Sequence, residues 1–148
     1  MAQMQVSTRI DATPEQVFDF IDHWQNAKRY MRRMVRYELV DPDGGTGVGA
    51  RFHISVEAAG KRLNGTIEVT ENDRPRRISF RNIDGVKVVG NWTLRPDGSG
   101  THVTLDSTYE PPGGIIGRMV AAFISANAKG DLNASLAKLK QLVEAEKA

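Results

Sequence analysis

Polar side chains interrupt a few apolar rows of this sequence, at positions that could bind or react with a small molecule. Asn82 continues the alternating apolar row that includes Phe80, and Ser107 and Tyr109 continue the row that includes Leu105. Amide and hydroxyl groups on an apolar surface orient a small ligand by hydrogen bonding. A positioned phenol can also transfer a proton to a reacting group. The alternative is that these side chains only mark strand ends near solvent.

Metal and nucleophile chemistry have little support in the sequence. The chain has no cysteine, which excludes a thiolate nucleophile, Cys-ligated zinc and an iron–sulfur centre. Its histidines, His23, His53 and His102, share no spacing that would gather them around a metal ion. Ser107 and His53 are expected on opposite faces of a sheet, and no Gly-x-Ser-x-Gly motif occurs, so a hydrolytic triad is disfavoured. We predict neither a metal nor an organic cofactor.

A basic cluster lies between residues 28 and 36, a stretch without an acidic residue. It consists of Lys28, Arg29, Arg32, Arg33 and Arg36. Such a cluster is typical of a solvated face, but it could also steer an anionic ligand or contact an anionic membrane surface or an acidic partner. The net charge of the whole chain is only +2, so nucleic acid is not an expected partner.

The elements that position these residues begin with a predicted antiparallel sheet. Turn signals recur at residues 41–45, 59–61, 72–75, 84–85 and 96–100, and no interval between them has room for a crossover helix. Apolar residues alternate with polar ones in the intervening segments. They are Phe52, Ile54 and Val56; Ile67 and Val69; Ile78 and Phe80; Trp92 and Leu94; and Val103 and Leu105. This period of two predicts one covered face and one wet face, with Arg51, His53 and Ser55 on the wet face.

Two short helices are predicted to follow a first strand at residues 4–10. Thr13 and Gln16 form a capping box, and Pro14 suits the first helical position. An apolar stripe then recurs at helical spacing in the first helix. It comprises Val17, Phe20, Ile21 and Trp24. A second short helix is expected over residues 26–31.

A long C-terminal helix is predicted over residues 115–146, which contain only Gly117 and Gly130 as breakers. The helix carries two apolar stripes, rotated by roughly 150° from each other. One comprises Ile116, Met119, Val120 and Phe123; the other comprises Leu132, Leu136, Leu139 and Val143. Either the helix bends near Gly130, or its first half contacts a ligand, a membrane or a second subunit. A homodimer is therefore among the open arrangements.

Length and composition predict one domain over residues 1–148. The chain is 40% hydrophobic, enough for one core but too short for two ordinary domains. Its first residues lack the pattern of a signal peptide, and no apolar run approaches the roughly 18 residues of a membrane span. We expect a soluble, cytoplasmic protein.

Several segments, in this order, resemble the START/Bet v 1-like superfamily, also called the polyketide cyclase/dehydrase and lipid-transport group. They are STRIDATPEQVFDFI at 7–21, GVGARF at 47–52, GTIEVTE at 65–71 with RPRRI at 74–78, and residues 132–144. The resemblance covers almost the whole chain and implies an α+β helix-grip fold. In this fold a curved antiparallel sheet wraps around the C-terminal helix, and an apolar cavity lies between them. The superfamily includes carriers, sensors and enzymes.

Three functions are compatible with this resemblance. The first is binding or transport of a hydrophobic small molecule, such as a lipid, a quinone or a polyketide-like compound. The second is a polyketide cyclase/dehydratase-like enzyme, although no buried acid or base is evident. The third is a membrane- or protein-interaction module that uses the basic cluster. The candidate ligand-binding residues are Tyr37, Phe52, Ile54, Phe80, Asn82, Trp92, Ser107, Tyr109, Met119 and Phe123.

Overall fold

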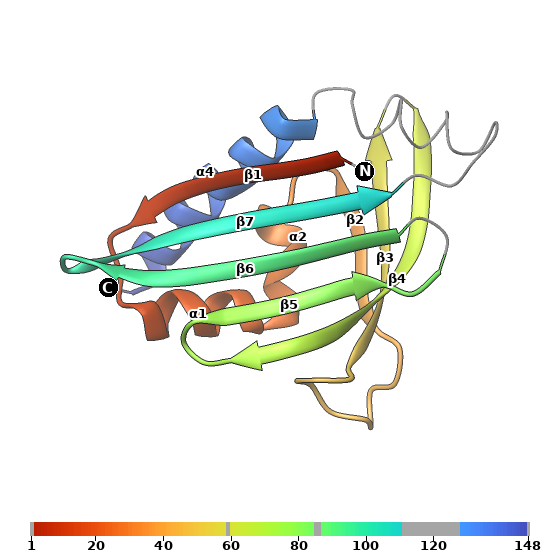
Figure 1. Cartoon of the computed structure of the whole chain (residues 1–148), viewed down its shortest axis with the longest axis horizontal. Coiled ribbons are helices and arrows are strands. Elements are labelled where there is room, and N and C mark those ends of the chain that lie inside the picture. The colour runs from red at the N-terminus through yellow and green to blue at the C-terminus, as the bar shows by residue number, and fades with distance from the viewer. Residues whose placement is uncertain (1, 59, 85–86, 111–127, 148) are drawn as a thin grey trace.

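Seven antiparallel strands form one curved sheet, and the helices cover one of its faces (Figure 1). The computed structural model describes residues 2–58, 60–84, 87–110 and 128–147. The strands are β1 (Ala2–Ile10), β2 (Met34–Leu39), β3 (Arg51–Ala58), β4 (Lys61–Asp73), β5 (Arg77–Asn82), β6 (Lys87–Asp97) and β7 (Gly100–Glu110). Their order across the sheet is β1-β7-β6-β5-β4-β3-β2, so β2 to β7 form a meander and β1 closes onto β7. This is the helix-grip arrangement predicted from the sequence.

The alternation of apolar and polar residues sets the two faces of the sheet, as predicted. Phe52, Ile67 and Trp92 are buried on the concave face. A bulge in β4 shifts the register so that Val69 pairs with Phe80 whereas Glu71 pairs with Ser79. The extra residue reverses the facing of the last part of β4, because side chains alternate with a period of two.

One outer-face prediction is wrong. Ser55 was expected to face water, but its exposed fraction is only 1%. Its hydroxyl donates to Oδ1 of Asn64 on the neighbouring strand at 2.6 Å. A short side chain between longer neighbours on a pleated sheet can be covered by them, and its polar group is then satisfied by a cross-strand hydrogen bond.

The first helical segment consists of α1 (Pro14–Asp22), the 3₁₀ turn η1 (Trp24–Asn26) and α2 (Ala27–Tyr30). The predicted capping box is present: Gln16 N donates to Thr13 Oγ1 at 3.2 Å, and Thr13 N donates to Gln16 Oε1 at 2.9 Å. The predicted apolar stripe needs one correction, because α1 ends before Trp24. The change to 3₁₀ geometry separates Trp24 from the buried face of α1 and places it at the edge of the cavity described below.

The C-terminal helix α4 (Ala128–Glu146) packs on the sheet beside β1 (Figure 1). Its predicted stripe is confirmed, because Leu136, Leu139 and Val143 are buried and Leu132 packs against them. The helix includes Gly130. The predicted helical residues 115–127, with the stripe that contains Met119 and Phe123, lie outside the described residues.

Hydrogen bonds join the end of α4 to the turn after β1. Glu144 accepts from the backbone N–H of Asp11 at 2.8 Å, and Lys140 Nζ donates to the carbonyl oxygen of Arg9 at 2.9 Å. These contacts hold the helix against the sheet edge that is formed by β1. Among the described residues, no helix combines the length and the apolar character that crossing a membrane requires.

Candidate functional site

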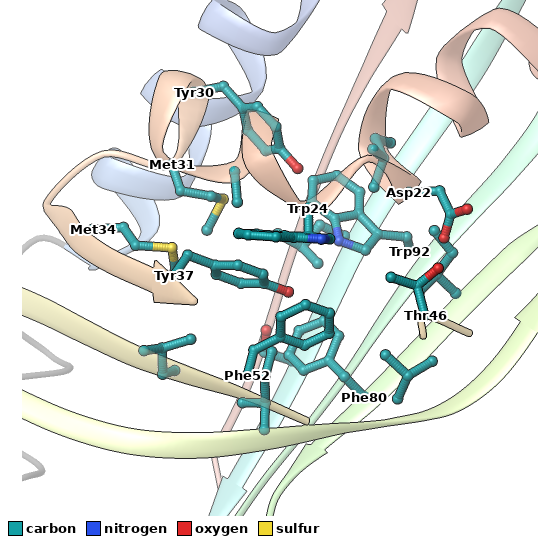
Figure 2. Close-up of a pocket in the computed structure, with 18 of the residues that line it drawn as sticks. Asp22, Trp24, Tyr30, Met31, Met34, Tyr37, Thr46, Phe52, Phe80 and Trp92 are labelled. Carbon is teal, nitrogen blue, oxygen red and sulfur yellow. The ribbon is translucent and has the colours of Figure 1, made fainter. Parts of the chain in front are cut away.

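A cavity of about 220 Å³ lies between the concave face of the sheet and the segment from α1 to α2 (Figure 2). Strands β2 to β7 supply one wall, α1, η1 and α2 supply the other, and Leu132 of α4 contributes to the lining. The aliphatic and methionine lining residues are Ile21, Ala27, Met31, Met34, Ile54, Ile67, Val69, Ile78, Leu105 and Leu132. The site is therefore an apolar cavity of the size of a small organic molecule.

Among the described residues, six aromatic rings line the same cavity. They belong to Trp24, Tyr30, Tyr37, Phe52, Phe80 and Trp92. The rings of Tyr37 and Phe52 lie 4.9 Å apart, and Trp24 lies 6.1 Å from Phe52. On the opposite side, Tyr30 meets Trp92 edge to face at 6.2 Å. Tilted and edge-to-face ring pairs at these distances are favourable, so the aromatic residues of the lining stabilise one another's positions.

The position of Phe80 depends on the absence of a side chain at Gly90, its partner on β6. A Cβ atom at Gly90 would lie only 2.2 Å from Cζ of Phe80. The ring therefore occupies the space that a side chain at Gly90 would fill. The cross-strand pairing that brings Gly90 opposite Phe80 cannot be read from one sequence.

Two tyrosine hydroxyls supply the main polar atoms deep in the cavity. Burial raises the pKa of Tyr30 far above its usual value of 10.0, and Tyr37 raises it further. Burial also raises the pKa of Tyr37, with a smaller contribution from the Asp22 carboxylate. Both phenols are therefore neutral hydrogen-bond donors near neutral pH. Neither hydroxyl has a hydrogen-bond partner among the residues that the structure describes.

The two ends of the cavity differ in polarity (Figure 2). Met31 and Met34 lie at one end, and Asp22 and Thr46 lie at the other. Asp22 is the last residue of α1, and its Oδ1 accepts a hydrogen bond from Nδ2 of Asn72 at 2.8 Å. A bound molecule would thus meet soft apolar groups at one end and a carboxylate at the other.

Six of the ten candidate residues line this cavity. They are Tyr37, Phe52, Ile54, Phe80, Trp92 and Ser107. Asn82 does not line it: its amide lies over Gly65, with Oδ1 at 2.9 Å from the position of a Gly65 Cβ, and Nδ2 donates to the carbonyl of Asp84. The side chain of Tyr109 and all of Met119 and Phe123 lie outside the described part of the structure.

Four further lining residues, Trp24, Tyr30, Met31 and Met34, were not among the candidate ligand-binding residues. They lie in η1, in α2, directly after α2 and at the start of β2, where each element is only a few residues long. Periodicity needs a longer window to assign a face. The usable signal is compositional, because two aromatic residues and two methionines within eleven positions are unusual for an exposed connection.

The histidines lie away from any common site. His53 Nδ1 lies 3.3 Å from the hydroxyl of Thr66, whereas Ser107 lines the cavity. Within the described ranges, no group of three His, Asp or Glu side chains converges as a metal site would require.

Four of the five members of the basic cluster have acidic neighbours in the fold. Arg32 and Arg33 both contact Asp131 at the start of α4, at 3.2 and 2.8 Å. Arg29 contacts Glu146, and Arg36 contacts Glu38 at 3.0 Å. Asp131 and Glu146 belong to the distant helix α4, whereas Glu38 lies two residues after Arg36 on β2. Three acids therefore compensate three of the five positive charges of the cluster.

Comparison with solved structures supports the fold. A crystal structure from Thermus thermophilus matches with a TM-score of 0.83 and 24% identity, over 99% of this chain and all of that one. The Zhui aromatase/cyclase from a Streptomyces species matches with a TM-score of 0.72 and 18% identity, over 98% of this chain and 97% of that chain. At these identities the likeness shows the fold alone.

One further structure, the di-domain aromatase/cyclase BexL, is 26% identical with a TM-score of 0.67. The match covers 97% of this chain but 47% of BexL, so this chain corresponds to about half of that protein. A search of curated proteins yields no match to the sequence. The sequence profile described as polyketide cyclase/dehydrase and lipid transport, however, matches residues 1–144. Because that match spans nearly the whole chain, the protein belongs to the polyketide cyclase/dehydrase and lipid transport family.

Proposed function

We propose that this protein binds a hydrophobic small molecule, of the quinone, polyketide-like or lipid kind, in the cavity between the sheet and α1–α2. The observation that carries the proposal is the lining itself. Six aromatic rings surround a space of about 220 Å³, and two buried phenols point hydrogen-bonding groups into it. Apolar walls with a few fixed polar groups are the usual composition of a small-molecule site.

The size of the cavity indicates a compact ligand. A dry apolar cavity of about 150 Å³ is enough to bind benzene, and pockets for drug-sized molecules begin near 300 Å³. The 220 Å³ found here suits one or two fused rings better than a long acyl chain.

The test combines extraction with a cavity-filling variant. Protein purified under mild conditions is extracted with organic solvent and analysed by mass spectrometry against a blank, and binding of naphthylmethanol is measured by calorimetry. Ala27→Leu extends a lining side chain into the cavity, whereas Ala137→Leu makes the same change on the exposed face of α4. We expect Ala27→Leu to lose the extracted species and the probe, and Ala137→Leu to keep both. A clean extract together with no probe binding to the unaltered protein would refute the proposal.

An enzymatic role is a second candidate, favoured by one observation. The neutral phenols of Tyr30 and Tyr37 could donate hydrogen bonds to a carbonyl oxygen of a confined substrate and so assist cyclisation or dehydration. The test is incubation with a β-polyketone thioester, with Tyr30→Phe and Tyr37→Phe as variants. Product that the unaltered protein forms and these variants do not would support an enzymatic role. If the unaltered protein leaves the substrate unchanged, the enzymatic role is refuted and only the binding function remains.

A further inference from the structure

The charge of the cavity lining narrows the class of ligand beyond its hydrophobic character. Asp22 is the only charged side chain among the described residues that line the cavity. We propose that the cavity selects a small aromatic molecule that carries a protonated amine, with the amine at the Asp22 end and the ring system toward Met31 and Met34. This inference rests on the proposed binding function and specifies its substrate class.

Asp22 is exposed, and no basic side chain among the described residues forms an ion pair with it. Its one described polar contact is the neutral amide of Asn72. The carboxylate one helical turn earlier, Asp19, is held instead by Arg74 through two hydrogen bonds of 2.8 and 2.9 Å. Arg74 is therefore engaged by a different acid.

Two further features favour a cation at this end. Asp22 is the C-terminal residue of α1, where the helix dipole adds negative potential. The Asp22 carboxylate also contributes to the raised pKa of Tyr37, which indicates that its field reaches the interior of the cavity. The aromatic lining then contributes in the same direction, because the faces of Trp, Tyr and Phe rings attract organic ammonium groups.

The same features oppose anionic ligands. A carboxylate or phosphate placed near Asp22 would meet a like charge, and no lysine, arginine or histidine is among the described lining residues to receive it. Neutral molecules remain acceptable to the walls, and a hydroxyl gains a hydrogen bond to the carboxylate but no ion pair. The lining therefore predicts the order amine, then alcohol, then carboxylate for molecules that share one ring system.

The test uses three probes with one ring system and different charge: naphthylmethylamine, naphthylmethanol and naphthoate. Affinities are measured by calorimetry near neutral pH and low salt. We expect the amine to bind about tenfold more tightly than the alcohol, and naphthoate to bind most weakly. Asp22→Asn retains the acceptor for Asn72 but removes the charge, so it should abolish the preference for the amine and change the affinity for the alcohol much less.

Two control variants keep the outcome interpretable. Glu15→Gln replaces an exposed carboxylate by its amide on the same helix, outside the cavity, and keeps the Asp19–Arg74 pair, so it should leave all three affinities unchanged. Asp22→Glu should retain the preference. If the alcohol binds but the amine binds no tighter, or if Asp22→Asn leaves the preference intact, the inference is overturned and the proposed binding function stands. If the alcohol also fails to bind, the binding function itself fails, and the inference fails with it.

Discussion

At the scale of single residues, the shape of the cavity depends on one glycine as much as on its aromatic rings. Phe80 lies across Gly90 on the neighbouring strand, and Tyr37 and Phe52 contact each other along the adjacent wall. Because Gly90 has no side chain, the ring of Phe80 can lie directly over its backbone. This position of the ring sets the shape of the cavity wall. The absence of a side chain at Gly90 therefore determines the position of Phe80.

We expect Gly90→Ala to displace Phe80 and to change both stability and binding. The added methyl group overlaps the ring, and overpacking of this kind costs about 1–3 kcal/mol. The urea midpoint should fall, and affinity for naphthylmethanol should fall with it. Val89→Ala, on the exposed outer side of the same strand, serves as the control and should change neither quantity. A fully stable variant with unchanged affinity would show that Phe80 does not depend on Gly90.

Residue-level prediction from the sequence succeeded where strands were regular. Parity along the strands placed Phe52, Ile54, Phe80 and Trp92 on the face that lines the cavity. It failed for Asn82, because a residue at the end of a strand can turn toward the following loop and bond there. It could not find Tyr30, since the four residues of α2 are too few to define a face.

At the scale of elements, α4 combines an apolar face with a polar attachment at its end. Leu136, Leu139 and Val143 are buried against the sheet, and the spacing that predicted this face is regular over the described length of the helix. The polar attachment was not predictable, because it joins Glu144 to the backbone of Asp11, 133 residues away. Helical periodicity is a local signal, whereas the partner of a helix end is decided by the tertiary fold.

The attachment of α4 predicts a defined pH dependence of stability. Hydrogen bonds from Lys140 and from the backbone N–H of Asp11 lower the pKa of Glu144 below its usual value of 4.5. A lowered pKa in the folded state means that the stabilisation is present above pH 4.5 and is lost as the pH falls through the folded-state value. The free energy of unfolding should therefore decrease on acidification in this range.

Glu144→Gln should remove that part of the pH dependence. We expect the variant to be less stable than the unaltered protein near neutral pH and to converge with it in acid, when urea midpoints are compared across the range. Glu110→Gln is the matched control, because Glu110 is exposed and has no ion pair among the described residues. Equal midpoints for Glu144→Gln and the unaltered protein at neutral pH would contradict the assigned role.

At the scale of the whole molecule, the order of the elements was predictable, whereas the irregular features that complete the cavity were not. Turn signals and alternation indicated the meander, and the capping box located the first helix. The bulge after Val69 and the 3₁₀ turn that holds Trp24 have no recognisable local signature in the sequence. Both features border the cavity, so the sequence was least informative where the site is formed.

The topology also predicts slow folding. The first strand pairs with the last along its length, from Ala2 opposite Tyr109 to Ile10 opposite Thr101, and α4 then packs beside β1. Proteins dominated by such non-local pairings fold in milliseconds to seconds, whereas helical bundles fold in microseconds to milliseconds. Stopped-flow fluorescence from the two tryptophans should show this slower range. Folding complete within microseconds would rule out β1–β7 pairing as the limiting step.

The pairing of β1 with β7 and the late position of α4 also bear on how the protein is made. A ribosome delivers β1 first, yet its partner strand ends at Glu110 and the residues of α4 that cover the apolar face extend to Glu146. At a synthesis rate of roughly 5–20 residues per second, a few seconds separate the completion of β7 from that of α4. During this time the part of the face that α4 covers stays exposed. We therefore expect chaperones that shield apolar surface to bind the nascent chain until α4 packs against the sheet.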